Sequence, residues 1–289
     1  MSMNKINVKD IEETDLDELE DMFLKEEGLG DPLLIEGSLV WKKWMKNNLK
    51  RYSSIGKIAY FDSKIVGMLQ YIPKPKHRVS EIKWTFVDGG QHDQEVKKML
   101  LQETIKEFKR PKSYFGYEMA KGLVTYLNPF LSSDEDEEFY KQSGFKEISD
   151  TDNNLLFYPF EDVSIEVPEV ADLPIDESYR DDILIFVNPI TPHCLKEAMK
   201  TLKKVRDLGP EIPIRLFAPV GDTEELNYAF SIPVSLVIKD EIIDSSRLGD
   251  ENLLERFKTT ECKADFICSS QDKADKNSRD VMGKIEPLW

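Results

Sequence analysis

An acidic stretch at residues 161–182, EDVSIEVPEVADLPIDESYRDD, interrupts the periodic hydrophobic patterns of the chain. It holds two prolines and a clear excess of acidic residues, which is typical of a linker between domains. A chain of 289 residues is also long enough for two domains of ordinary size. We therefore predict a first domain at residues 1–163, a linker at 164–182, a second domain at 183–260 and a C-terminal tail at 261–289.

Helical and extended patterns alternate along the first domain. The segments expected to be helices are residues 10–27, 38–50, 94–109 and 134–145. The extended segments are a hairpin at residues 57–73 and strands at 81–88, 113–119 and 153–160. This order predicts an α/β or α+β domain in which helices pack on a mixed sheet.

The second domain has a simpler order of elements. The expected strands lie at residues 183–188 and 212–220 and in a hairpin at 234–246. The expected helices lie at residues 192–208, 221–230 and 250–260. The second domain is therefore predicted to be another α/β unit, with the order βαβαββα.

The net charge of −16 restricts the partners that the chain can have. A strongly acidic protein repels polyanions, so nucleic acid is not expected as the main partner. No window approaches the ~18 consecutive apolar residues of a membrane-spanning helix. The charged N-terminus lacks the basic and apolar regions of a secretory signal. We therefore expect no membrane association and a cytoplasmic location.

Three cysteines and three histidines restrict thiol and metal chemistry. Three cysteines are too few for a disulfide scaffold. His193 and Cys194 are neighbours in the sequence, but a structural zinc site needs about four ligands in one cluster. No metal site is therefore expected.

Cys194 stands at the start of a predicted helix, in the sequence Thr191-Pro192-His193-Cys194. Thr191 is expected to cap this helix and Pro192 to occupy its first position. Two interpretations of Cys194 are open. The thiol is either buried, where it acts as a small apolar side chain, or reactive, with a pKa lowered by the helix N-terminus and by His193.

The element order of residues 183–260 resembles that of thioredoxin. TPHC stands where thioredoxins have the C-P-x-C motif, and SIPVSLVIKDEII resembles the stretch in which a cis-proline opens the hairpin. The resemblance implies a cis bond before Pro233, and it implies that Thr191 replaces the nucleophilic cysteine while Cys194 takes the resolving position. A threonine hydroxyl forms no disulfide, so dithiol oxidoreductase activity is not expected.

Residues 5–160 resemble the GNAT superfamily of acyl-CoA-dependent N-acetyltransferases in element order and in two motifs. One motif is FYKQSGF, and the other is WTFVDGGQHDQEVKKMLLQETI. The resemblance implies acetyl-CoA as co-substrate, bound between the strands WTFVD and SYFGYEM, and an amine of a small molecule or a protein as acceptor. It also implies that Tyr140 protonates the departing thiolate and that the backbone of Val87 or Asp88 polarises the thioester carbonyl.

The cofactor loop departs from the GNAT pattern. The family has Arg/Gln-x-x-Gly-x-Gly/Ala, whose backbone amides hold the pyrophosphate of CoA, whereas this chain has Glu95 and Lys97 at the two small positions. Side chains there block close approach, and a carboxylate repels phosphate, so weakened binding is expected, with Lys97 and Lys98 offsetting the repulsion in part. The residues expected at the cofactor are Phe86, Val87, Asp88, His92, Val96, Lys97 and Lys98.

A general base is also needed to deprotonate the amine, and the candidate is Glu118, at the end of the expected strand 113–119. The whole chain resembles two-domain proteins that join a GNAT domain to a C-terminal YoaP-type thioredoxin-like domain. The leading prediction is an N-acyltransferase with a degenerate thioredoxin-like accessory domain. Two alternatives are open. One is a non-catalytic binding or regulatory protein built from two degenerate enzyme folds. The other is a monothiol redox protein that uses Cys194, together with Cys262 or Cys268.

Overall fold

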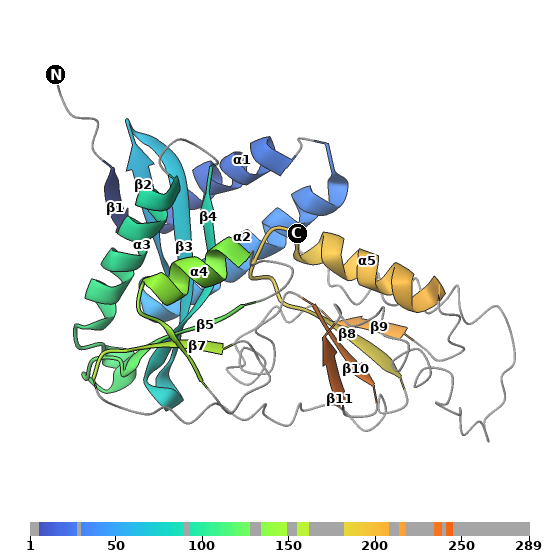
Figure 1. Cartoon of the computed structure of the whole chain (residues 1–289). Coiled ribbons are helices and arrows are strands. Elements are labelled where there is room, and N and C mark those ends of the chain that lie inside the picture. The colour runs from blue at the N-terminus through green and yellow to red at the C-terminus, as the bar shows by residue number, and fades with distance from the viewer. Residues whose placement is uncertain are drawn as a thin grey trace, which may run out of the picture. The chain divides into compact units, whose positions relative to one another are not determined.

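The structure is a computed structural model of the whole chain. It describes residues 6–27, 30–88, 93–127, 134–148, 155–161, 182–207, 214–217, 234–238 and 241–244. Contacts divide the chain into two compact units, residues 1–31 with 41–170 and residues 32–40 with 171–289 (Figure 1). The predicted linker, except Asp182, lies outside the described residues, as does the tail at 261–289.

The first unit is a mixed α/β structure, as predicted. Its strands are β1 (Asn7–Asp10), β2 (Gly56–Phe61), β3 (Lys64–Lys74), β4 (Val79–Val87), β5 (Gly122–Tyr126), β6 (Lys146–Glu147) and β7 (Leu155–Pro159). Its α-helices are α1 (Leu16–Glu27), α2 (Pro32–Tyr52), α3 (Asp93–Phe108) and α4 (Asp134–Gln142), of which α2 begins with residues grouped with the second unit. Three short 3-10 helices are η1 (Glu13–Asp15), η2 (Pro75–His77) and η3 (Ser113–Phe115).

The seven strands form one sheet in the order β1-β2-β3-β4-β5-β7-β6. Every pairing is antiparallel except that of β4 with β5, which is parallel. A parallel pair needs a crossover, and here the chain makes it through α3 and η3 (Figure 1). The parallel pair lies in the interior of the sheet, between the antiparallel hairpins.

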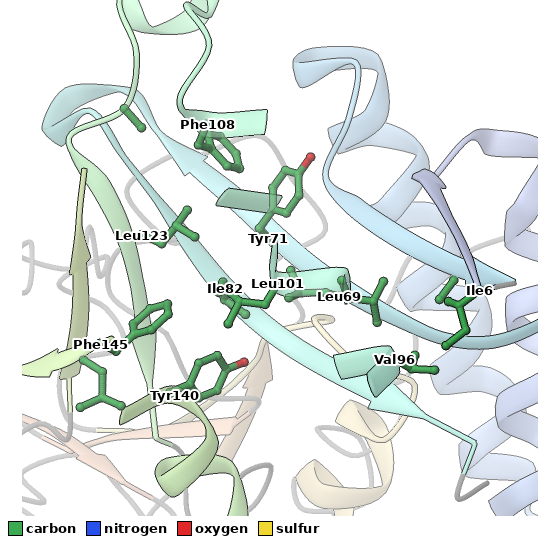
Figure 2. Packing of buried hydrophobic residues seen from close by; sticks show 14 of the residues in the cluster. Ile6, Leu69, Tyr71, Ile82, Val96, Leu101, Phe108, Leu123, Tyr140 and Phe145 are labelled. Carbon is green, nitrogen blue, oxygen red and sulfur yellow. The ribbon is translucent and has the colours of Figure 1, made fainter. Parts of the chain in front are cut away.

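One face of the sheet packs on α3 and α4. Leu69, Tyr71, Ile82 and Leu123 from the strands meet Val96, Leu100, Leu101 and Phe108 from α3 and Tyr140 from α4 in a single apolar cluster (Figure 2). Gly67 allows α3 to approach β3, because a Cβ at Gly67 would lie 2.9 Å from Cγ1 of Val96. The burial of these side chains is the main force that holds the helices on this face.

The opposite face of the sheet packs on α1 and α2 through aromatic side chains. The Phe23 ring lies 5.3 Å from that of Trp41, 4.9 Å from that of Trp84 and 4.8 Å from that of Phe86. Between α2 and this face of the sheet, the indole nitrogen of Trp41 donates a 3.0 Å hydrogen bond to the side-chain oxygen of Gln70 on β3. A buried glutamine is thereby satisfied, as buried polar groups must be.

The prediction of a strand at residues 113–119 is wrong. Residues Ser113–Phe115 form η3, and Gly116 and Tyr117 follow it with positive φ angles of 68° and 63°. Two successive residues in the left-handed region turn the chain and cannot continue a strand. The strand that pairs with β4 is β5, Gly122–Tyr126, which follows immediately in the sequence.

The second unit contains β8 (Ile183–Val187), α5 (Cys194–Asp207), β9 (Ile214–Phe217), β10 (Val234–Ile238) and β11 (Glu241–Asp244). Its sheet has the order β11-β10-β8-β9, with β8 and β9 parallel and the other pairs antiparallel. These strands fall inside the predicted extended segments. The helices predicted at residues 221–230 and 250–260 lie outside the described part of the chain.

Among the described residues, no helix combines the length and the apolarity needed to cross a membrane. Within the same residues, no three His, Cys, Asp or Glu side chains gather in a way that could hold a metal ion.

Candidate functional site

The parallel pairing of β4 with β5 ends halfway along β4. The register runs from Val79↔Gly122 to Ile82↔Thr125, whereas β4 itself continues to Val87. Over residues Lys83–Val87, β4 therefore pairs with β3 alone among the described strands (Figure 1). We call this segment, Lys83–Val87, the open edge of β4.

A β-bulge lies where this pairing ends. Gln70 of β3 faces Trp84, while its neighbour Tyr71 faces Ile82, so Lys83 is one residue more than the ladder needs. A bulge bends its strand and increases the local twist. The extra residue thus gives a physical cause for the divergence of β4 from β5.

The backbone groups of the open edge alternate in direction. The Asp88 amide donates a 3.1 Å hydrogen bond to the Val66 carbonyl of β3. In an antiparallel ladder the neighbouring residues then direct their amide and carbonyl groups away from that partner. By this alternation Thr85 and Val87 present their backbone groups toward the side of β5. Of the two amides predicted to polarise a carbonyl, Val87 remains a candidate, while the Asp88 amide is bound within the sheet.

Tyr140 of α4 places its hydroxyl at this same point. The hydroxyl lies 3.1 Å from the Thr85 hydroxyl on β4, and the Thr125 hydroxyl on β5 is a second hydrogen-bond partner. The side chain is buried in the apolar cluster on the α3 face (Figure 2). Burial raises the pKa of Tyr140 to about 12, an effect that the two threonines oppose and the Asp136 charge reinforces. At neutral pH the group is therefore a protonated, positioned hydroxyl.

The other residues predicted at the cofactor do not lie together in the structure. Lys97 forms a 2.8 Å ion pair with Asp136 of α4. Val96 is buried in the core, Lys98 is exposed, and Phe86 packs on Phe23 on the opposite face. His92 lies outside the described residues. The first turn of α3 contains two acids, Asp93 and Glu95, so the helix start is not a simple anion site.

Glu118 does not lie near the open edge. It follows η3 and precedes β5, and its carboxylate pairs with Arg78, the residue before β4. Because β4 and β5 are parallel, their first residues meet at one end of the pair and Tyr140 lies toward the other. The prediction of Glu118 as the general base depended on the strand 113–119, which does not form, and the structure does not support it.

The sequence analysis did not single out a buried charge cluster on β3 and β4. Glu81 lies 2.5 Å from the amine of Lys83 and 3.3 Å from that of Lys74, and all three side chains are buried. Burial by itself raises the pKa of Glu81, but the two lysines hold it below its ordinary value. Glu81 alternates with Ile82 of the α3 face, so the cluster faces the α1 and α2 side. The sequence did contain a signal for this cluster: Glu81 and Lys83 are two positions apart in an otherwise apolar strand, and that spacing puts both side chains on one face.

The TPHC segment of the second unit is buried at Thr191, Pro192 and Cys194, whereas His193 is half-buried. Helix α5 begins at Cys194, two residues later than predicted, and the buried Thr191 hydroxyl has no hydrogen-bond partner among the described residues. Thr191 is therefore not the side-chain cap that was predicted. The backbone oxygen of His193 accepts a 3.0 Å hydrogen bond from the amide of Glu197. Pro233 and the two tail cysteines lie outside the described residues.

Cys194 lacks the features of a reactive thiol. Its side chain is fully buried, and burial raises the pKa of the thiol to about 12, although backbone amides at the start of α5 oppose the shift. Of the two interpretations, the structure favours the small apolar side chain over the low-pKa nucleophile.

We expect iodoacetamide to leave Cys194 unmodified in the folded protein at pH 7.5 and to modify it after unfolding in guanidinium, because only the exposed thiolate reacts. Mass spectrometry of the peptide that contains Cys194 measures this directly, and it separates this site from Cys262 and Cys268. Rapid modification of the folded protein at Cys194 would contradict the buried assignment.

The chain is similar to solved structures of acetyltransferases. No protein-family model matches the chain, and the search of curated proteins gives no match. Similar solved structures include the PaiA N-acetyltransferase from Thermoplasma acidophilum in complex with coenzyme A, which is 16% identical with a TM-score of 0.38 over 54% of this chain and 99% of that one. An acetyltransferase of the GNAT family from Staphylococcus aureus is 18% identical, with a TM-score of 0.40 over 54% of this chain and all of its own.

A third similar structure is the ribosomal-protein-S18-alanine N-acetyltransferase from Escherichia coli. It is 15% identical to this chain, with a TM-score of 0.37 over 53% of this chain and 91% of its own. Each of these matches spans about half of the present chain. The function proposed below rests on the residues of this chain.

Proposed function

We propose that the first unit is a GNAT-type N-acyltransferase that transfers an acetyl group from acetyl-CoA to an amine. The observation that carries the proposal is the open edge of β4 with the buried, protonated Tyr140 hydroxyl beside it. An exposed strand edge binds extended chains that carry amides, because their N–H and C=O groups complete the ladder. The pantetheine arm of CoA is such a chain, and it ends in the thiol that carries the acyl group.

In the proposed reaction the acyl carbonyl accepts a hydrogen bond from the open edge, with Val87 as the candidate donor. The amine attacks the carbonyl carbon, so a C–N bond forms and the C–S bond breaks. Tyr140 donates its proton to the departing sulfur, and the nitrogen gives up its proton to a base or to water. Glu81 is the nearest buried carboxylate along β4, but its lowered pKa makes it a weak base, so we assign it no catalytic role.

The second unit is proposed to be a thioredoxin-like accessory domain. The strand order β11-β10-β8-β9, with a parallel β8/β9 pair joined through α5, supports this assignment. This domain is expected to lack dithiol oxidoreductase activity, because Thr191 stands at the first cysteine position of the C-P-x-C motif and Cys194 is buried. The redox alternative therefore receives no support from Cys194.

A non-catalytic binding protein is the second candidate for the whole chain. Two observations favour it over the enzyme. The first turn of α3 is acidic, and Lys97, expected at the phosphates, is paired with Asp136. Both features weaken the local attraction for a pyrophosphate.

Calorimetric titration with acetyl-CoA, CoA and acetyl-pantetheine separates these two candidates. A micromolar dissociation constant for acetyl-CoA, about −8 kcal/mol, is expected if the open edge holds the cofactor. Acetyl-pantetheine lacks the pyrophosphate, and its binding reports the open edge alone. If neither thioester binds, the enzymatic proposal fails, and the non-catalytic alternative stands.

A further inference from the structure

The ion pair between Lys97 and Asp136 differs from the surface ion pairs of the same unit. Lys97 comes from α3 and Asp136 from α4, so the pair joins two helices through residues that are 39 positions apart in the sequence. Their side chains are only 15% and 20% exposed, whereas those of Lys141 and Glu137 within α4 are 37% and 41% exposed. Shielding from water strengthens a charge pair, so this ion pair stabilises the packing of α4 on α3 more than an exposed pair would.

Helix α4 needs such a link. It has nine residues, DEDEEFYKQ, and a helix of this length is marginal on its own in water. Asp136 and Tyr140 are four residues apart, so they lie on the same face of α4. The ion pair therefore fixes the N-terminal turn of α4 on the side that carries the Tyr140 ring into the core.

The groups around the Tyr140 hydroxyl come from three elements. Thr85 of β4 and Thr125 of β5 are neutral hydrogen-bond partners, and Asp136 on its own helix is the nearby charge. The charge of Asp136 raises the pKa of Tyr140, and Lys97 of α3 pairs with that charge. The hydroxyl thus faces a carboxylate whose effect depends on a lysine from another helix.

We propose that Lys97 and Asp136 are positioning residues for Tyr140, which hold α4 on α3 and balance the charge beside the hydroxyl at the open edge. The catalytic meaning of this assignment rests on the acyl transfer proposed above. The assignment itself concerns Tyr140 in the free protein. It can therefore be tested without substrate or cofactor.

The test is NMR of the full chain labelled with [13Cζ]tyrosine, in which the Tyr140 signal among the ten tyrosines is assigned by its loss in Tyr140→Phe. At about pH 10 lysine amines keep most of their charge. With a pKa of about 12, about one hundredth of Tyr140 is ionised at this pH, and the position of its 13Cζ signal reports that fraction. Asp136→Asn removes a negative charge and is expected to raise the ionised fraction about two- to fivefold. Lys97→Met removes the positive charge that pairs with Asp136, and this variant is expected to lower the ionised fraction of Tyr140.

Opposite shifts in the two variants are the decisive result, since a merely structural role would disturb Tyr140 in the same direction in both. Lys97→Arg is expected to restore the wild-type value. Glu138→Gln is the matched control, because Glu138 is an exposed carboxylate on the same helix, two residues from Tyr140, and should change nothing. Circular dichroism checks folding at the same pH. If Lys97→Met unfolds, the uncharged pair Lys97→Met/Asp136→Asn replaces it and must lower the ionised fraction from that of Asp136→Asn toward the wild-type value.

Shifts of both variants in one direction, or no shift in either, would overturn the assignment. A failure of the acyltransferase proposal gives a different pattern. Acetyl-CoA would then show no binding and no turnover, while the opposite shifts of the Tyr140 signal would persist. The two failures are therefore distinguishable.

Discussion

Replacement of Tyr140 by phenylalanine is expected to lower kcat for acyl transfer by about 10²- to 10⁴-fold, the usual contribution of a positioned general acid. The dissociation constant of acetyl-CoA should change less than about twofold, since the ring, its packing and the open edge of β4 all remain. The two constants are measured by steady-state turnover with the acceptor amine and by calorimetric titration. The hydroxyl meets Thr85 at 3.1 Å, so its loss removes a proton donor and little else.

The matched control is Tyr71→Phe. Tyr71 is also a buried tyrosine of the same apolar cluster, and its hydroxyl lies 2.8 Å from that of Ser54, away from the open edge. The Tyr71→Phe variant therefore loses one buried hydroxyl, and the proposed site is unchanged. Equal turnover in Tyr140→Phe and the wild type would mean that water protonates the thiolate, and the role assigned to Tyr140 would be abandoned.

Replacement of Glu81 by glutamine is expected to lower the free energy of unfolding by about 3–5 kcal/mol, the usual effect of removing one partner from a buried ion pair. The variant leaves the amines of Lys74 and Lys83 buried beside an uncharged amide. Urea unfolding followed by circular dichroism measures the change. Glu103→Gln is the control, because its pair with Lys106 is largely exposed and should contribute less than about 1 kcal/mol.

The Glu81 cluster also predicts how stability depends on pH. The two lysines hold the pKa of Glu81 below its ordinary value of 4.5 in the folded protein. A carboxylate with a lowered folded-state pKa stabilises the fold fully above its unfolded pKa, and this contribution is lost as the pH falls through the folded pKa. The difference in stability between the wild type and Glu81→Gln should therefore shrink at acidic pH. A difference that stays constant down to pH 3 would contradict this account.

Long periodic segments were predictable from the sequence. The acidic start of segment 134–145 and its stop at Gly144 indicated α4, and the helical spacing of apolar residues from Val96 to Phe108 indicated α3. The family resemblance named Tyr140 as a site residue and the strand WTFVD as a neighbour of the cofactor. In the structure the Tyr140 hydroxyl lies 3.1 Å from that of Thr85 in this strand.

The errors came from features that have no period. The stretch from Ser113 to Met119 has the aromatic composition of a strand, but the positive φ angles at Gly116 and Tyr117 depend on local turn geometry that composition does not show. The partner of Lys97 could not be foreseen, since Asp136 is 39 residues away and the two meet only when α3 and α4 pack on the sheet. Burial of Cys194 likewise depends on tertiary contacts, and the sequence left it open.

The bulge at Lys83 makes the candidate site depend on strand length. β4 contains one residue more than β3 between two facing pairs, Gln70↔Trp84 and Tyr71↔Ile82. A chain without Lys83 would keep Thr85 on the face of Tyr140 and Phe86 on the face of Phe23, since the alternation on either side of the bulge would simply join up. It would lose the bend that separates β4 from β5. A one-residue deletion, with every side chain of the proposed site still present, could therefore close the edge on which the site is built.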